Sequence, residues 1–216
     1  MQTRLGVRGK IMNISTYDYI YVPEMTGNIE IDVKNLLELN GKEDTYRHVL
    51  TVADTNVQIA EMYGLDKTKC RVSGLLHDIS VIIQPKDMLD YFTNCTLCID
   101  ESENIYPFLL HQRAAKMLSE SLFKISDPDI LSSVECHTTL KDNPSEYDMV
   151  LFIADKLSWD QDGKPSFYDM VKKELSVSLE RASYAYINHI IDNNMVLHPH
   201  QWLLQAKKYF EKLILR

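Results

Sequence analysis

Apolar residues recur at helical spacing along most of the chain, and residues that start or stop helices separate the periodic stretches. In the stretch 43–63, Val49, Val52 and Ala53 fall on one side, and Gly64 follows as a stop. Similar patterns predict helices over 32–40, 69–80, 108–123, 128–140, 147–159 and 167–192, a shorter one from Pro85 and a last one from Pro199. The sequence therefore predicts an all-α protein.

Capping residues stand at the expected ends of these helices. Gly41 suits the left-handed position after the first helix, and Asp66 can accept hydrogen bonds from the first backbone N–H groups of the third. The Ser-Asp-Pro run at 126–128 is a strong start signal, and Ser145 with Asp148 resembles a weak capping box. Loops are then predicted over 94–104 and 160–166.

The first thirty residues lack this helical pattern. Tyr17, Tyr19 and Tyr21 favour extended structure, and Pro23 and Gly27 break any helix. A chain of 216 residues is long enough for one well-buried core and short for two. We therefore predict an N-terminal extension of unassigned function over 1–30 and one helical domain over 31–216.

The formal net charge of −8 narrows the classes of partner. Nucleic-acid phosphates and anionic lipids repel a chain with this balance, so we expect neither nucleic-acid nor membrane binding. An anionic small substrate could still bind where metal ions supply local positive charge. No apolar run is long enough for a membrane span and the start lacks the apolar core of a secretory signal, so a cytoplasmic location is expected.

The four cysteines are expected to be reduced, because the chain is large for a fold held together by disulfides. Cys95 and Cys98 form a CxxC, which could be half a zinc site or a redox pair. The chain has no second CxxC and no βαβ pattern around this one, so the pair receives no role.

Histidine and aspartate residues lie on or beside the apolar faces of five predicted helices. They are His48, His77, Asp78, His111, His137 and Asp155. Burying so many polar groups is tolerable only if they satisfy one another or bind metal, and helical bundles build metal sites by such convergence. Imidazole with carboxylate and without thiolate suits iron, manganese or zinc better than magnesium or calcium.

The order of these residues resembles the metal-dependent phosphohydrolases of the HD-domain family. The resemblance is carried by YRHVLTVA, GLLHDIS, FLLHQRAA, ECHTT and FIADK, which cover the chain from about 47 to 156. The smallest ligand set of the family is a His, a His-Asp pair and a distal Asp. Because His111 and His137 are additional to that set, the chain looks like the subgroup that holds two metals. Its phrases are similar to those of the YqeK-like symmetrical diadenosine tetraphosphate hydrolases. The resemblance implies an HD-domain helical bundle with a metal site in its core.

The same resemblance implies hydrolysis of a nucleotide substrate, diadenosine tetraphosphate, to two ADP. Two divalent or mixed-valence metal ions would take part, with iron expected and manganese or zinc as alternatives. The first metal would be held by four residues, namely His48, His77, Asp78 and Asp155. Asp78 would also bridge to a second metal held by His111 and His137. Water between two such cations loses a proton near neutral pH and becomes the nucleophile.

Three departures from the family pattern bear on the substrate. Gln112 and Leu140 stand where the family usually has Gly, and LSWDQDGKPS replaces a Glu-Pro phrase with a nearby Arg. That Arg would ordinarily bind a phosphate through two hydrogen bonds. Four cations could compensate for it, namely Arg47, Arg113, Lys156 and Lys164.

In addition to the metal ligands, we predict catalytic and substrate-binding residues. Asp78, Arg47 and Lys156 are the expected catalytic residues, and Arg113 and Thr138 are the expected substrate-binding residues. A charged residue beside an internal ligand is often only part of a solvated helix face, which is the competing interpretation for each cation.

Other functions are open from the sequence. The same metal site could hydrolyse another nucleotide or phosphoester, and an HD scaffold could bind a nucleotide without turning it over. The presence of all six expected ligands favours an active enzyme. Trp159 and Phe167 could stack on a base, although core packing is the commoner role of such residues. The oligomeric state is open, a homodimer included.

Overall fold

A computed structural model describes residues 12, 14–159 and 163–214 of the chain. All regular structure in these residues is helical, which confirms the predicted all-α fold. The α-helices of this part are α1 (Ile29–Leu39), α2 (Glu43–Tyr63), α3 (Lys67–Leu76), α4 (Pro85–Asn94), α5 (Glu101–Ile105), α6 (His111–Ser121), α7 (Pro128–Cys136), α8 (Glu146–Leu157), α9 (Tyr168–Leu175), α10 (Leu179–Asp192) and α11 (Gln201–Ile214). Shorter 3-10 helices are η1 (Ile14–Thr16), η2 (Ile79–Ile82) and η3 (Pro107–Leu110). None of the helices described is both long and apolar enough to cross a membrane.

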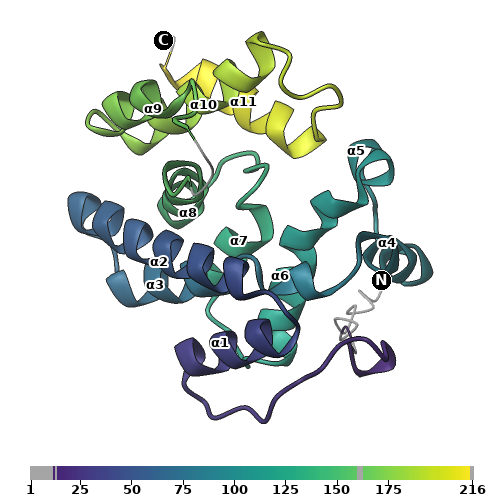
Figure 1. Ribbon diagram of the computed structural model, residues 1–216. Coiled ribbons are helices and arrows are strands. Elements are labelled where there is room, and N and C mark those ends of the chain that lie inside the picture. Colours follow the sequence, from purple (N-terminus) through teal and green to yellow (C-terminus); the bar gives the residue numbers. More distant parts are fainter. Residues whose placement is uncertain (1–11, 13, 160–162, 215–216) are drawn as a thin grey trace, which may run out of the picture.

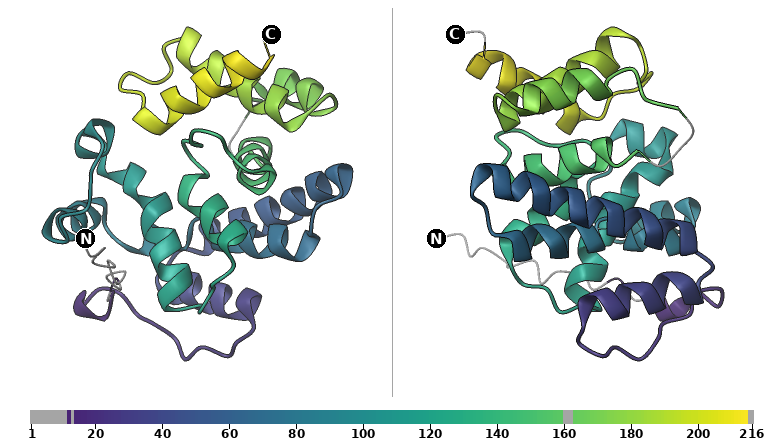
Figure 2. Two further views of the ribbon diagram at one scale, coloured as in Figure 1. Left: turned by 180° about the vertical axis from the view of Figure 1, so that it is seen from behind. Right: turned by 60° about the vertical axis from the view of Figure 1, so that its left-hand side comes forward.

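The helices are stacked in layers around α8 (Figure 1). Helices α9, α10 and α11 form an upper layer, α2 and α3 run side by side beneath α8, and α1 lies at the opposite end of the molecule (Figures 1 and 2). Helix α8 is central, since every side chain from Met149 to Ala154 is buried. The hydrophobic core therefore surrounds the helix that also carries Asp155.

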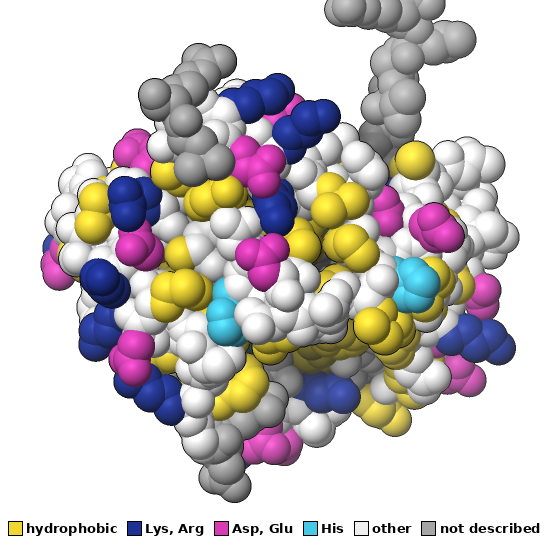
Figure 3. Space-filling model, turned by 90° about the horizontal axis from the view of Figure 1, so that it is seen from above, with side chains coloured by type: hydrophobic (Ala, Val, Ile, Leu, Met, Phe, Trp, Pro, Cys, Tyr) yellow, Lys and Arg dark blue, Asp and Glu magenta, His cyan; other side chains and the backbone are white. Residues whose placement is uncertain are grey.

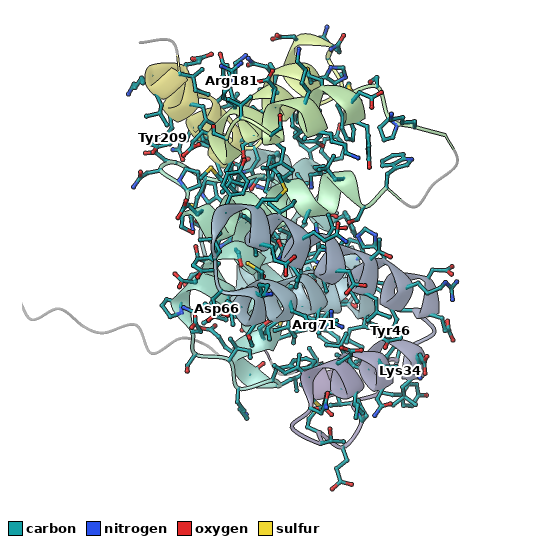
Figure 4. The ribbon with its side chains drawn as sticks, turned by 90° about the vertical axis from the view of Figure 1, so that its left-hand side faces the viewer. Lys34, Tyr46, Asp66, Arg71, Arg181 and Tyr209 are labelled. Carbon is teal, nitrogen blue, oxygen red and sulfur yellow. The ribbon has the colours of Figure 1, made fainter. Side chains whose placement is uncertain are left out.

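Arg71 on α3 links the outer helix α1 to the central pair of helices. Its guanidinium donates to Glu30 of α1 at 2.8 Å and to Asp54 of α2 at 2.7 Å. It lies at the level where α1 faces the other two helices (Figure 4). Such partly exposed ion pairs contribute only about 0–1 kcal/mol each, so they orient α1 more than they stabilise the fold.

Most predicted helix boundaries are confirmed by the backbone. Gly41 and Gly64 have φ angles of +66° and +70°, the left-handed conformation expected after a helix. Asp66 and Asp127 each accept hydrogen bonds from the N–H groups two and three positions later. Ser145 forms the predicted capping box at the start of α8. Of the predicted loop over 160–166, residues 163–166 are described and lie outside any helix.

Two predicted elements differ from the structure. The single helix predicted over 167–192 is wrong, because α9 ends at Leu175 and α10 begins at Leu179. Ser178 separates them, since its hydroxyl accepts a hydrogen bond from the N–H of Arg181 at 3.1 Å and so caps a new helix. The loop predicted over 94–104 contains α5, which opens with a capping box from Asp100.

The described part of the first thirty residues packs against the helices. Three apolar side chains are buried in the core shared with the helices, namely Met12, Ile14 and Ile20. The hydroxyl of Tyr19 accepts a hydrogen bond from the N–H of Gln84 at 3.1 Å and donates to the carboxylate of Asp87 on α4. Helix α1 begins at Ile29. An extension that ends at residue 30 stays a prediction, and residues 1–11 and 13 lie outside the described residues.

Gly74 allows α2 and α3 to approach each other closely. A Cβ atom at this position would lie 2.6 Å from the Cα of Ala53 and 2.9 Å from its N. These are backbone atoms of α2, which cannot rotate away as the end of a side chain can. The close approach also fixes the end of α3, where His77 follows three residues later.

We expect Gly74→Ala to lower the free energy of unfolding by about 2–3 kcal/mol, because overpacking would push the two helices apart. Urea unfolding followed by circular dichroism measures this change. Gly64→Ala is the matched control: its Cβ would meet no atom within 4 Å, and only the φ of +70° opposes it, at about 1 kcal/mol. A Gly74→Ala protein as stable as the wild type would contradict the close approach.

Candidate metal centre

Five helices bring six histidine and aspartate side chains to the centre of the molecule. These are His48 on α2, His77 and Asp78 after α3, His111 at the start of α6, His137 after α7 and Asp155 on α8. Three of the six, His77, His111 and His137, stand where an α-helix begins or ends, so rigid helices fix their positions. The structure thus brings together all six ligands predicted from the sequence.

Two groups of ligand atoms share one carboxylate. His48, His77 and Asp78 offer atoms that all lie within 4.8 Å of one another, and Asp78, His111 and His137 do the same. The Nε2 atoms of His111 and His137 each lie 3.4 Å from Oδ1 of Asp78. The Nε2 of His77 lies 3.6 Å from Oδ2. The two oxygens of Asp78 therefore face different groups, as a bridging carboxylate requires.

Asp155 adds a second carboxylate to the first group. Its Oδ1 lies 3.2 Å from Nε2 of His48 and 3.8 Å from Nε2 of His77. Asp155 thus lies beside both imidazoles of the first group. The second group has two imidazoles and the shared carboxylate of Asp78.

Backbone carbonyl groups hold three of the imidazoles with Nε2 pointing inward. In His77, His111 and His137, Nδ1 lies 2.7, 2.7 and 2.9 Å from the carbonyl oxygen of the residue three positions earlier. A carbonyl oxygen only accepts hydrogen bonds, so each Nδ1 carries the proton and each Nε2 carries a lone pair. Histidines that bind metals commonly donate their second N–H in this way.

The inward lone pairs require positive charge between them. The Nε2 atoms of His111 and His137 face each other at 3.0 Å, and with both Nδ1 atoms protonated neither can donate to the other. Among the described side chains, Nε2 of His77 and Oδ1 of Asp78 are buried without a hydrogen-bond partner. Each such atom costs about 1–3 kcal/mol if it stays unsatisfied. These residues fit a pair of metal ions, which would accept all of the lone pairs.

The environment sets the charge states that metal binding needs. Burial lowers the pKa of both His77 and His111 to about 4, so both are neutral near pH 7. Burial acts to raise the pKa of Asp78, but the surrounding imidazoles, His77 first, hold it well below its usual range. Burial likewise opposes the ionisation of Asp155, and the ammonium of Lys156 outweighs it, so that this pKa is also lowered. Neutral imidazoles and ionised carboxylates are the forms that bind metal.

Two of the predicted catalytic and substrate-binding residues lie beside the ligands. The ammonium of Lys156 pairs with the carboxylate of Asp155 and donates to the carbonyl of His137 at 3.3 Å. Burial lowers the pKa of Lys156, but Asp155 outweighs it and the pKa is raised. The hydroxyl of Thr138 lies 3.2 Å from Nε2 of His111. Both side chains therefore lie in contact with candidate ligands.

Two of the predicted cations are engaged at the surface. Arg47 precedes His48 on α2, but its side chain is 69% exposed and pairs with Asp44. Lys164 pairs with Asp169, and its side chain is also largely exposed. Neither is brought into contact with the ligands in the structure.

Arg113 is engaged in the interior and not at the metal centre. Its guanidinium pairs at 2.8 Å with Glu103, whose side chain is fully buried, and donates to the carbonyl of Cys98 at 2.9 Å. It also lies over the ring of Phe92, 4.6 Å from the centroid. These contacts use the guanidinium to hold α5 against α6.

The loop after α7 is shaped by Gln112 and Leu140, two of the predicted departures from the family pattern. The carboxamide oxygen of Gln112 is buried and accepts hydrogen bonds from the N–H groups of Thr138 and Thr139 at 3.1 and 3.3 Å. Leu140 is buried and has a φ of +56°, a conformation that costs a residue other than glycine about 1 kcal/mol. The left-handed backbone is therefore kept without glycine, and Gln112 fixes Thr138 beside the metal centre.

Phe108 is a residue at the site that the sequence pattern did not single out. Its carbonyl accepts the hydrogen bond from Nδ1 of His111, and its ring stacks on that imidazole with centroids 4.5 Å apart and an interplanar angle of 18°. The available signal was its place three residues before a predicted ligand, the same spacing at which carbonyls hold His77 and His137.

Several known proteins are similar to this chain. A Lactococcus lactis subsp. cremoris protein, described as an uncharacterized protein in the pepC 5′ region, is 38% identical over 148 residues, which cover 68% of this chain and 75% of that protein. A symmetrical bis(5′-nucleosyl)-tetraphosphatase of Staphylococcus aureus is 30% identical over 132 residues, which cover 59% and 65%. The corresponding protein of Halalkalibacterium halodurans is 22% identical over 175 residues, which cover 76% and 92%.

A solved structure shares the fold. The crystal structure of a predicted HD superfamily hydrolase involved in NAD metabolism, from Clostridium acetobutylicum, superposes with a TM-score of 0.74 at 26% identity and covers 84% of this chain and 96% of that one. The HD domain family matches residues 45–160, a range that holds all six ligands. The chain therefore belongs to the HD domain family of hydrolases.

Proposed function

We propose that the protein is a metal-dependent phosphohydrolase that cleaves diadenosine tetraphosphate symmetrically into two ADP. The observation that carries the proposal is the Asp78 carboxylate shared between two groups of ligands. Two such groups can hold two cations close together, an arrangement that suits hydrolysis of phosphate bonds. The similarity to two symmetrical tetraphosphatases supports the choice of substrate.

The roles of the chain follow from the positions of its side chains. Two bound metal ions would supply an acidified water and positive charge for the phosphoryl oxygens. Lys156, held between Asp155 and the carbonyl of His137, presents an ammonium that can donate to a phosphate oxygen. Oxygen from water joins one central phosphorus, the bond from that phosphorus to the bridging oxygen breaks, and ADP leaves with the electron pair. One water is consumed for two ADP.

The donor set supports iron as the metal, with manganese or zinc as alternatives. Four imidazoles and two carboxylates converge, and neither group of ligand atoms contains a thiol. The four cysteines of the described chain are free and stand outside both groups.

A second candidate is hydrolysis of another nucleotide or phosphoester by the same centre. It is favoured by the placement of the predicted phosphate-binding cations, since Arg113 is held by Glu103 and Arg47 by Asp44. Neither guanidinium is then free to bind a substrate phosphate through two hydrogen bonds. A third candidate is a nucleotide-binding regulator without turnover.

Incubation of the metal-loaded protein with diadenosine tetraphosphate is expected to give ADP as the only nucleotide product, because water attacks next to the central bridge. Anion-exchange chromatography of the products measures this directly. Asp78→Asn protein prepared in parallel serves as the control for contaminating hydrolases and is expected to be inactive. Formation of AMP with ATP would contradict symmetrical cleavage, turnover of other nucleotides alone would support the second candidate, and binding without turnover would support the third.

We expect Lys156→Met to lower kcat for diadenosine tetraphosphate about 100-fold at unchanged metal content, because a buried ammonium stabilises charge that develops on the phosphoryl group. Arg47→Met is the matched control and is expected to change kcat less than about twofold, since that guanidinium is 69% exposed and pairs with Asp44. Steady-state kinetics with metal analysis of each protein provide the measurement. Equal losses in both variants would contradict the assignment of Lys156.

A further inference from the structure

Phe108 connects the metal centre with the protein surface. One side of its ring stacks on the imidazole of His111, whose Nε2 faces the ligands of the second group. The side chain is nevertheless 51% exposed. An aromatic ring that is half buried against a metal ligand and half open to solvent is thus available to a bound molecule.

Two more exposed rings belong to the same region. Tyr106 is separated from Phe108 only by Pro107 and is 43% exposed. Its ring lies 6.0 Å from that of His198, an exposed residue of the segment between α10 and α11. We call these three side chains, Tyr106, Phe108 and His198, the aromatic platform. Figure 3, which shows the molecule from above, has hydrophobic side chains exposed among the charged ones on this face.

Polar contacts hold the two segments that carry the platform. The carboxylate of Asp100, at the start of α5, accepts a hydrogen bond from the N–H of Gln201 at 3.1 Å. The Nε2 of His200 lies 3.5 Å from Oε1 of Glu103, and both side chains are buried. The start of α11 is therefore fixed against α5, which holds together the two segments that carry the rings.

The chain offers a nucleotide few cations near this centre. The guanidinium of Arg113 is used by Glu103, that of Arg47 is used by Asp44, and the net charge is −8. Affinity for a nucleotide must then come from metal ions and Lys156 at the phosphates and from contacts to the base. A flat base binds an aromatic ring by stacking. Phe167, a base-stacking candidate from the sequence, is buried in the core and cannot serve.

We propose that the aromatic platform stacks a purine base of the nucleotide whose phosphates bind at the metal centre. The inference rests on the proposed function, because it assigns the base-binding part of the same site. Phe108, which stacks on His111, takes the base of the nucleotide bound there, and the paired rings of Tyr106 and His198 offer a second exposed aromatic surface two residues before it.

Binding of ADP and of inorganic pyrophosphate tests the platform, because both ligands carry a diphosphate and only ADP carries a base. Isothermal titration calorimetry in Mn²⁺ gives the Kd of each ligand for wild type and for Phe108→Leu, which keeps an apolar side chain but removes the aromatic ring. Phe108→Leu is expected to raise the Kd for ADP about tenfold and the Kd for pyrophosphate less than about twofold. Phe108→Trp is expected to bind ADP at least as tightly as wild type. Metal content is measured for every variant.

Tyr21→Ala is the matched control. Tyr21 is 60% exposed and lies on the segment that bonds to Asn40 at the end of α1. The Tyr21→Ala protein should bind ADP as tightly as wild type. If Phe108→Leu does not fold, Tyr106→Ala combined with His198→Ala takes its place, with the same expected selective loss of ADP affinity. These residues are exposed, so their truncation is not expected to disturb the core.

An equal rise in the Kd values for ADP and pyrophosphate would overturn the proposed base stacking, because Phe108 would then act only by holding His111. Unchanged ADP binding in the variants, or wild-type protein that binds ADP no tighter than pyrophosphate, would overturn it as well. The substrate proposal is judged separately by turnover. Wild-type protein that leaves diadenosine tetraphosphate intact, while Phe108→Leu selectively loses ADP affinity, would refute that substrate and support the platform.

Discussion

The placement of one carboxylate, that of Asp78, is the constraint on which the rest of the site depends. It stands between imidazoles that point their Nε2 lone pairs inward, with His77 beside one oxygen and His111 and His137 beside the other. Ionised carboxylate and neutral imidazoles concentrate electron pairs at one point, which bound cations would satisfy. The ends of α3, α6 and α7 must therefore meet there, and the close approach of α2 and α3 at Gly74 helps to fix that meeting.

Much of the fold could be predicted because local chemistry decides most helix ends. Gly64 and Asp66 end one helix and start the next by interactions within a few residues, so a sequence pattern is enough. The break at Ser178 was missed because apolar spacing continues through it, while a single hydroxyl cap changes the backbone. Helix α5 was missed because a helix of five residues is too short to show a period, although its capping box was readable.

In the candidate site, the ligands could be predicted from the sequence, whereas the roles of the cations and of Phe108 could not. Its six ligands could be predicted because titratable residues on apolar faces need a common partner. The cations could not be assigned from sequence, since their roles depend on residues far along the chain or on exposure. Arg113 is held by Glu103, which in turn approaches His200 near the end of the chain. Phe108 could not be predicted as a site residue because its stacking on His111 depends on ring orientation and not on sequence spacing.

Anomalous diffraction at the iron edge, on crystals of protein purified without chelator, tests the shared carboxylate most directly. Two peaks are expected, both beside Asp78, one among His48, His77 and Asp155 and the other between His111 and His137. The measurement repeated at the manganese and zinc edges identifies the metal. A single peak, or metal bound away from Asp78 at all three edges, would contradict a carboxylate shared by two metal ions.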